Sequence, residues 1–131
     1  MQQVVAHHTD GKIIKGSSHD VAPGKAICHI KNEEGTHRID FADLKALYFV
    51  KDLSGDPDRN DSQEPMDDDI RRRGSRLMEI IFNDDERLVV LCNSFPPRGD
   101  RFFVLPVDLE SNNARILVNR GAVSAMNPLD A

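Results

Sequence analysis

Four arginines stand directly after the most acidic stretch of this chain, and they are the residues best suited to do chemistry. A guanidinium is a planar, permanently charged fork that pairs bidentately with phosphate. The spacing of Arg72 and Arg76, with three residues between them, predicts a pair that could hold a phosphate group. In a second interpretation, the arginines pair with the acidic residues 67–69 and simply cap that stretch. Both interpretations stay open, and Arg72 and Arg76 are the candidate ligand-binding residues.

The histidines and cysteines do not form a recognisable metal or catalytic pattern. Zinc needs three or four ligands, commonly supplied as close pairs, whereas His7 and His8 are adjacent and neighbouring side chains of a strand point to opposite faces. A nucleophile needs a base and an orienting acid within reach. Cys28 and His29 are also strand neighbours, and residues 17–20 follow no catalytic spacing. We therefore expect no catalytic residues, no metal and no cofactor, and a protein that is not an enzyme.

The composition argues against several classes of partner. The 131 residues carry a formal net charge of −5, which disfavours nucleic acids and anionic membranes because both need a positive surface. No apolar run approaches the roughly 20 residues that span a bilayer, so we expect no membrane insertion. The N-terminus has no secretory signal pattern, which predicts a cytoplasmic location. Cys28 and Cys92, the only pair that a disulfide could join, are then expected to be reduced and buried.

Short alternating apolar segments predict two β units separated by a linker. The first unit, residues 1–51, contains five strands, with a hairpin turn at Asp10-Gly11 and a bend at Gly16. Residues 52–75 form the linker. Its first part, residues 52–69, has eight acidic side chains against one arginine, a composition typical of disorder. The strand pattern resumes over the second unit, residues 76–131, which ends in a polar tail.

An offset of 74 residues aligns the two units and predicts an internal repeat. Turn positions and strand lengths agree along the alignment, although few residues are identical. The alignment places His8 on Phe82, which indicates a core or rim position for His8 rather than a metal ligand. It also sets both glycines of the first unit opposite larger residues: Gly11 opposite Asp85, and Gly16 opposite Val90. The second unit must therefore make these bends differently.

The opening of the chain resembles Sm-like and SH3-like small barrels, in which an apolar strand is followed by a turn such as Asp10-Gly11 and then by a glycine such as Gly16. More closely, the chain is similar to an uncharacterised bacterial family of tandem domains of this kind, found near PilZ and signalling modules. The segments that carry this similarity are Asp10-Gly11-Lys12, Lys15-Gly16 and Phe49-Val50-Lys51-Asp52. The resemblance implies a tandem-barrel fold and no particular activity.

The arginine pair resembles the Arg-x3-Arg motif with which PilZ domains bind a cyclic dinucleotide. Those domains also carry a downstream Asp/Asn-x-Ser-x2-Gly motif. In this chain the corresponding segment is Asn93-Ser94-Phe95-Pro96-Pro97-Arg98-Gly99, in which the serine comes one position early. The resemblance implies nucleotide sensing, and the displaced serine counts against it.

These observations predict an all-β protein of two tandem five-stranded SH3/Sm-like small barrels, packed together or paired between chains through open strand edges. The expected function is a non-enzymatic bacterial binding or adaptor module with a protein partner or a second copy as its ligand. The alternative is a PilZ-like module that senses a cyclic dinucleotide through Arg72 and Arg76. A third hypothesis is an Sm-like RNA-binding module, for which the stacking platforms would be Tyr48, Phe49, Phe102 and Phe103.

Overall fold

The computed structural model describes residues 1–55 and 60–130, and the predicted all-β fold is confirmed. The strands are β1 (Gln2–His8), β2 (Ile13–Ser18), β3 (Ile27–Asn32), β4 (Gly35–Asp40), β5 (Leu44–Val50), β6 (Arg76–Phe82), β7 (Arg87–Cys92), β8 (Arg101–Pro106), β9 (Asn113–Asn119) and β10 (Val123–Pro128). Three short 3-10 turns accompany them: η1 (Phe41–Asp43), η2 (Ile70–Arg73) and η3 (Arg120–Ala122). No helix in the described ranges is long and apolar enough to cross a membrane.

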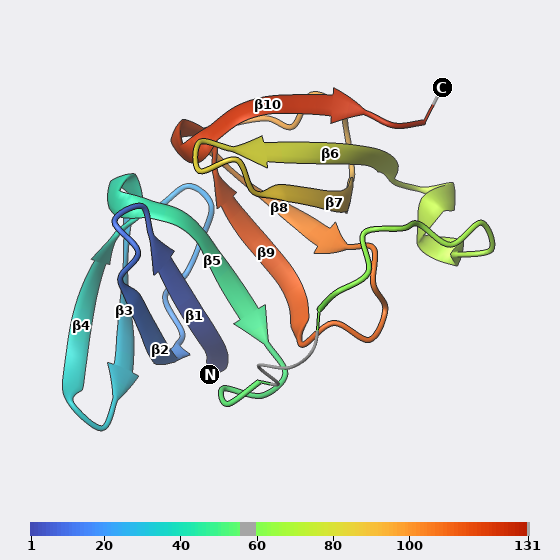
Figure 1. Cartoon of the computed structure of the whole chain (residues 1–131). Coiled ribbons are helices and arrows are strands. Elements are labelled where there is room, and N and C mark those ends of the chain that lie inside the picture. Colours follow the sequence, from blue (N-terminus) through green and yellow to red (C-terminus); the bar gives the residue numbers. More distant parts are fainter. Residues whose placement is uncertain (56–59, 131) are drawn as a thin grey trace.

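All ten strands belong to one antiparallel sheet, in the order β10-β6-β7-β8-β9-β5-β1-β2-β3-β4 (Figure 1). The first half of the chain, β1 to β5, supplies five neighbouring strands, and the second half, β6 to β10, supplies the other five. The halves meet where β5 pairs with β9, with Leu47 opposite Leu117 and Ala46 opposite Val118. The outermost strands are β4 and β10.

The two halves share one order of elements. Strands β6, β7 and β8 begin and end 74 residues after β1, β2 and β3. In each half a 3-10 turn then precedes the last strand. Asp40 caps η1 by accepting from the N–H of Ala42, and Asn119 caps η3 by accepting from the N–H of Gly121. Short polar side chains are suited to this role because their oxygens satisfy free backbone N–H groups.

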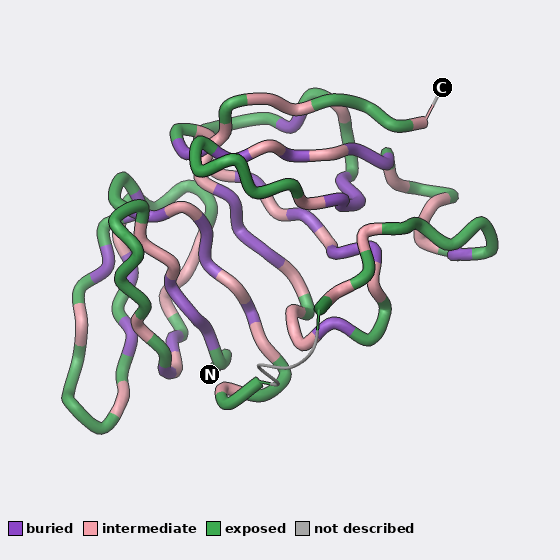
Figure 2. The backbone as a smooth tube through the Cα atoms, viewed as in Figure 1, coloured by how far each residue is buried: buried purple, intermediate pink, exposed green. Residues whose placement is uncertain are grey.

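Two hydrophobic cores lie on opposite faces of the sheet at the junction. One core belongs mainly to the second half, and Ala46 of β5 packs into it. The other belongs mainly to the first half, and Leu117 of β9 packs into it. Buried residues accordingly run along both of these strands in Figure 2. Cys28 lies in one core and Cys92 in the other, and both are buried free thiols.

The two halves make their first hairpin turn with the same kind of backbone conformation but with different residues. Gly11 has a φ of +94°, and Asp85, at the equivalent place in the second half, has a φ of +71°. Asp85 therefore adopts the left-handed conformation that glycine adopts freely. At Gly16 the restriction is space, because a Cβ atom there would lie 2.3 Å from the carbonyl oxygen of Lys31. Gly16 thus allows β2 and β3 to approach closely.

The segment that follows the first half is anchored to the second half. Part of the predicted disordered linker, residues 56–59, lies outside the described residues. Beyond it, the side chain of Gln63 accepts from the N–H of Val89 at 2.7 Å. Arg71 donates to the carbonyl oxygens of Pro106 at 3.0 Å and Val107 at 3.1 Å. These contacts satisfy backbone groups at the place where β7 and β8 stop pairing.

Candidate functional site

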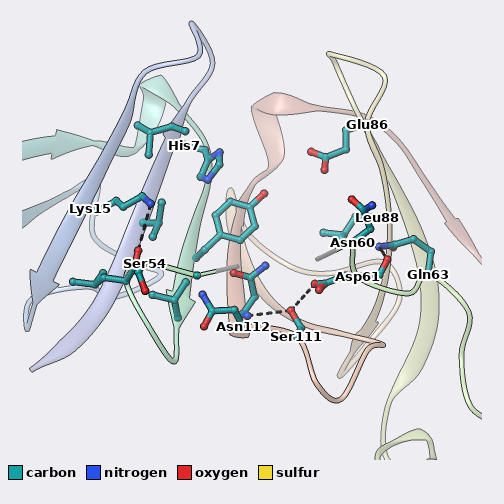
Figure 3. Close-up of a pocket in the computed structure, with 17 residues that line it drawn as sticks. His7, Lys15, Ser54, Asn60, Asp61, Gln63, Glu86, Leu88, Ser111 and Asn112 are labelled. Carbon is teal, nitrogen blue, oxygen red and sulfur yellow. Dashed lines mark hydrogen bonds between the residues drawn. The ribbon is translucent and has the colours of Figure 1, made fainter. Parts of the chain in front are cut away.

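A cleft of about 660 Å³ opens between the two halves (Figure 3). One wall comes from β1 and β2, the opposite wall from the start of β7, and the loops before and after the undescribed residues close one end. The volume is in the range of ligand-binding pockets. The lining mixes apolar residues (Val5, Ile13, Val50, Leu53 and Leu88) with amides (Asn60, Gln63, Asn112 and Asn113) and a few ionisable groups.

The strand pairing shows that the cleft and the core of the second half lie on the same face of the sheet. Val5 lies opposite Lys15 on β2 and opposite Tyr48 on β5, so these side chains share one face. Tyr48 in turn lies opposite Ile116, which is buried in the core of the second half. The same face of the sheet is therefore open to solvent over β1 and β2 and covered over β9.

His7 and Tyr48 form an aromatic pair in this cleft. Their ring centroids are 4.6 Å apart and the rings meet at 62°, an edge-to-face arrangement. Burial lowers the pKa of His7, and the charges of Lys45 and Lys15 lower it further, against the opposing effect of Glu86. Burial also raises the pKa of Tyr48, and the carboxylates of Glu86 and Asp84 raise it further. Near neutral pH both rings are thus held in their uncharged forms.

A half-buried lysine, Lys45, lies between the cleft and the junction of the two halves. The ammonium of Lys45 on β5 lies 2.7 Å from the carboxylate of Asp84, contacts the carboxylate of Glu86, and sits 4.7 Å from the ring centroid of Phe82. The pKa of Lys45 is raised: desolvation works against the charged form, and the hydrogen bonds to Asp84 and Glu86 outweigh it. The two carboxylates come from the hairpin between β6 and β7, so this contact connects the first half to the second.

A smaller cavity of about 210 Å³ adjoins the same group of side chains. His7 lines both cavities, and His8 lines only the smaller one. The pairing of β1 with β5 shifts register between His7 and His8, and both residues line the smaller cavity. Nδ1 of His8 lies 3.0 Å from the carbonyl oxygen of Lys12, so His8 occupies a rim position. No group of three or more His, Cys, Asp or Glu in the described ranges could hold a metal ion.

Hydrogen bonds fix the closed end of the cleft. The side chain of Asn112 accepts from the backbone N–H of Asp52 at 3.0 Å and donates to its carbonyl oxygen at 2.8 Å. The Ser111 hydroxyl donates to the carboxylate of Asp61 at 2.5 Å. Lys15 reaches across to the carbonyl oxygen of Leu53 at 3.3 Å. Figure 3 shows the bond between Ser111 and Asp61 at the lower end of the cleft and the bond from Lys15 at one side.

The two predicted ligand-binding arginines lie outside both cavities. Arg72 donates to the carbonyl oxygen of Met66 at 3.5 Å and lies 3.6 Å from the carboxylate of Asp67. Arg76 instead pairs with Asp130 near the C-terminus, at 3.2 Å. Their neighbour Arg71 pairs with the buried Asp69 at 2.6 Å and holds the pKa of that carboxyl below its usual range. Each of these three arginines thus has an acidic partner within the chain.

A His–Asp pair occurs elsewhere in the first half. Nδ1 of His29 lies 2.8 Å from the carboxylate of Asp20, whose pKa is lowered chiefly by the backbone N–H of His29. The Ser18 hydroxyl donates to Asp20 and not to the imidazole, and Ser18 is buried. The neighbouring thiol of Cys28 is also buried, which raises its pKa to about 11. This cluster therefore holds neither a serine nor a thiolate activated as a nucleophile.

The four aromatic residues considered as stacking platforms have structural contacts. Phe49 and Phe102 are buried in the two cores. The Arg115 guanidinium contacts both Phe49 and Phe103, with 4.3 Å from its central carbon to each ring centroid, and the two rings contact each other with 5.7 Å between centroids. Only Tyr48 is part of the cleft.

His7 and Tyr48 were not selected as a site from the sequence. They come from strands about forty residues apart, and nothing local to either strand indicates that they meet. One signal was present: Tyr48 is the only tyrosine of the chain, in a strand that is otherwise aliphatic apart from Lys45 and Phe49.

Comparison with known proteins gives one match. A family model described as a family of unknown function, DUF6982, matches residues 1–130. No curated protein and no solved structure matches the chain.

Proposed function

Because the chain belongs to the DUF6982 family, whose function is unknown, we propose a function from its own geometry: a non-enzymatic binding module that takes an extended segment of a protein partner into the cleft. The observation that carries this proposal is the cleft of about 660 Å³ between β1–β2 and β7. Its lining combines apolar side chains and amides with a few ionisable groups, which suits a peptide because a peptide presents apolar side chains and neutral amide groups together.

The charges around the cleft support a neutral polar ligand. Glu86 is paired with Lys45, and the Lys15 ammonium is directed at a backbone carbonyl oxygen. No arginine lines this cavity among the described residues, although arginine is the residue best suited to bind phosphate. A peptide fits this distribution of charge better than a nucleotide does.

We also propose that the two halves are diverged copies of one five-stranded SH3/Sm-like unit. The shared order of elements and the constant offset of β1–β3 to β6–β8 support this origin. The cleft would then be a product of joining the copies, because β5 of one copy pairs with β9 of the other.

The non-enzymatic assignment is supported by the groups that the cleft contains. His7 makes its closest described ring contact with Tyr48, and neither belongs to an arrangement of nucleophile, base and orienting acid. The His29–Asp20 pair lies apart from both cavities. We propose a bacterial, cytoplasmic setting for this module, as expected from the sequence.

The cyclic-dinucleotide hypothesis stays a separate prediction with its own test. It rests on Arg72 and Arg76, which have different acidic partners, Asp67 and Asp130. Isothermal calorimetry with cyclic dinucleotides decides it, because the absence of heat at high micromolar ligand would discard it. The RNA hypothesis is not favoured by any observation on the cleft.

Selection of a random peptide library on the immobilised protein tests the proposed function. Ile13 lines the cleft and is 51% exposed, whereas Ile70 lies outside both cavities and is 72% exposed, so they form a matched pair of surface isoleucines. Enriched peptides should bind the wild type and Ile70→Glu equally, and should bind Ile13→Glu at least about tenfold more weakly. No enrichment, or equal binding to all three proteins, would refute the proposal.

A further inference from the structure

The hydroxyl of Tyr48 is an unused hydrogen-bonding group in the cleft. Tyr48 lines the cavity and is partly exposed, with its ring packed against the core of the second half. The hydroxyl makes no hydrogen bond with any described residue, and it is not among the buried polar atoms without a partner. The oxygen therefore meets the open space of the cleft. A phenol is usually placed with its polar end on a partner when the ring is packed.

The charged groups near the Tyr48 hydroxyl determine which kind of hydrogen-bond acceptor it can bind. Glu86 and Asp84 place negative charge near the phenol, which together with burial raises its pKa and keeps its proton in place. A protonated phenol can donate a hydrogen bond. Asp84 and Glu86 share the single ammonium of Lys45, so a net negative charge remains near the phenol and disfavours an anionic acceptor. An uncharged oxygen is the acceptor that meets both conditions.

His7 restricts the phenol further. Its ring meets the Tyr48 ring edge-on at 4.6 Å, so the two rings limit each other's orientation. The groups facing His7 are Lys45 from β5, Lys15 from β2, Glu86 from the turn before β7, and His8 on its own strand. Because burial and the two lysines favour the neutral imidazole, His7 does not supply a positive charge to an anion at this place.

We propose that Tyr48 is the specificity-determining residue of this cleft, and that its hydroxyl donates a hydrogen bond to an uncharged backbone carbonyl oxygen of the bound segment. This inference rests on the proposed function and adds the chemical class of the ligand group. A peptide carbonyl oxygen can accept this hydrogen bond without carrying a charge. A carboxylate or phosphate oxygen would be repelled by the negative charge of Glu86 and Asp84.

The chain provides its own reporter for the test. It has one tyrosine and no tryptophan, so its intrinsic fluorescence comes from Tyr48 alone. A selected peptide, acetylated at its N-terminus and amidated at its C-terminus, should change this fluorescence saturably. The free-acid form should bind no more tightly, and millimolar inorganic phosphate should leave the fluorescence unchanged.

Tyr48→Phe is the decisive variant, since it removes only the hydroxyl. We expect it to weaken binding of the capped peptide about tenfold, measured by calorimetry, because the peptide carbonyl is then buried without its donor. Unchanged amide spectra would show that the fold is intact. A requirement for the free carboxylate, or saturable binding of phosphate at Tyr48, would overturn the inference.

The outcomes also separate this inference from the proposed function. If Ile13→Glu weakens the peptide and Tyr48→Phe does not, the role of Tyr48 is refuted and the peptide cleft stands. If Ile13→Glu has no effect, the cleft is not the peptide site, and both fail. Loss of affinity in both variants, with Ile70→Glu unchanged, supports both.

Discussion

The ring of His7 on β1 meets the ring of Tyr48 on β5 edge-to-face, with 4.6 Å between the centroids. The contact joins neighbouring strands at the point where the sheet changes from an open face to a covered one. It places two titratable groups in the cleft, and each has a pKa displaced toward its neutral form.

Tyr48 should make the fold sensitive to alkaline pH. Its pKa is raised in the folded state, so the unfolded chain loses the phenolic proton first. The contribution to stability is full below about pH 10, the usual pKa of tyrosine, and is lost as pH rises above it. Absorbance of the single tyrosine should show ionisation well above pH 10 until the protein unfolds. Tyr48→Phe should remove its share of the alkaline loss of stability; an ordinary pKa in the folded protein would contradict the structure.

His7 should make the stability of the fold sensitive to acidic pH. Its pKa is lowered in the folded state, so the unfolded chain takes up the proton first as pH falls. The stability that it contributes is present above about pH 6.5 and is lost as pH falls from there through the folded pKa. Urea unfolding at several pH values should show a shallower acid loss in His7→Gln than in the wild type. The exposed His19 is the control, and His19→Gln should retain the wild-type slope.

Gly16→Ala should destabilise the first half by close contact. The new Cβ would lie 2.3 Å from the Lys31 carbonyl oxygen and 2.7 Å from a methyl group of Ile30, so β2 and β3 must separate. We expect a loss of about 2–3 kcal/mol in the free energy of unfolding. Gly24→Ala meets no atom within 4 Å and should change stability by less than about 0.5 kcal/mol. Equal effects of the two substitutions in denaturant titrations would contradict this account.

Asp85→Gly should stabilise the hairpin between β6 and β7. The φ of +71° at Asp85 is strained for a residue with a Cβ atom, and glycine relieves that strain while adding freedom to the unfolded chain. The net gain should be about 0.5–1 kcal/mol, seen as a higher melting temperature. Asp84→Gly is the contrast, since it removes the partner of Lys45 and should lower stability.

Arg71→Ala should release the segment that follows the undescribed residues. The substitution leaves the buried Asp69 with only the backbone N–H of residue 71 as a donor among the described residues, and leaves two carbonyl oxygens without the guanidinium. We expect a loss of about 3 kcal/mol and faster proteolysis within residues 60–75. Arg73→Ala is the matched control, because the exposed side chain of Arg73 makes no hydrogen bond or ion pair with the described residues, and it should leave both measurements unchanged. Equal proteolysis of both variants would refute the anchoring role.

The strands were predictable because they are local features. Asp10-Gly11 marks a hairpin wherever it occurs between apolar segments, and alternating residues such as those near Arg38 and Ile39 mark a half-buried strand. The pairing of β5 with β9 was harder to predict, because it joins segments about seventy residues apart. A signal existed in the apolar runs Ala46-Leu47 and Ile116-Leu117-Val118, since uninterrupted runs are typical of strands buried on both faces.

The cleft was not predictable from the same information. Whether His7 meets Tyr48 depends on which strand lies beside β1, and spacing along the chain does not determine that. Similarly, the composition of the predicted linker, residues 52–75, does not indicate the contacts of Gln63 and Arg71, which depend on backbone groups left free at the ends of β7 and β8. Composition does not register such partners.

Strands β5 and β9 have a core on each side, one belonging to each half. A substitution at Ala46 therefore alters packing in the core of the second half, and a substitution at Leu117 alters packing in the core of the first half. Heating should therefore unfold the chain in a single step. A chain shortened to either half would expose core residues that the other half now covers, so each half depends on the other for a complete core.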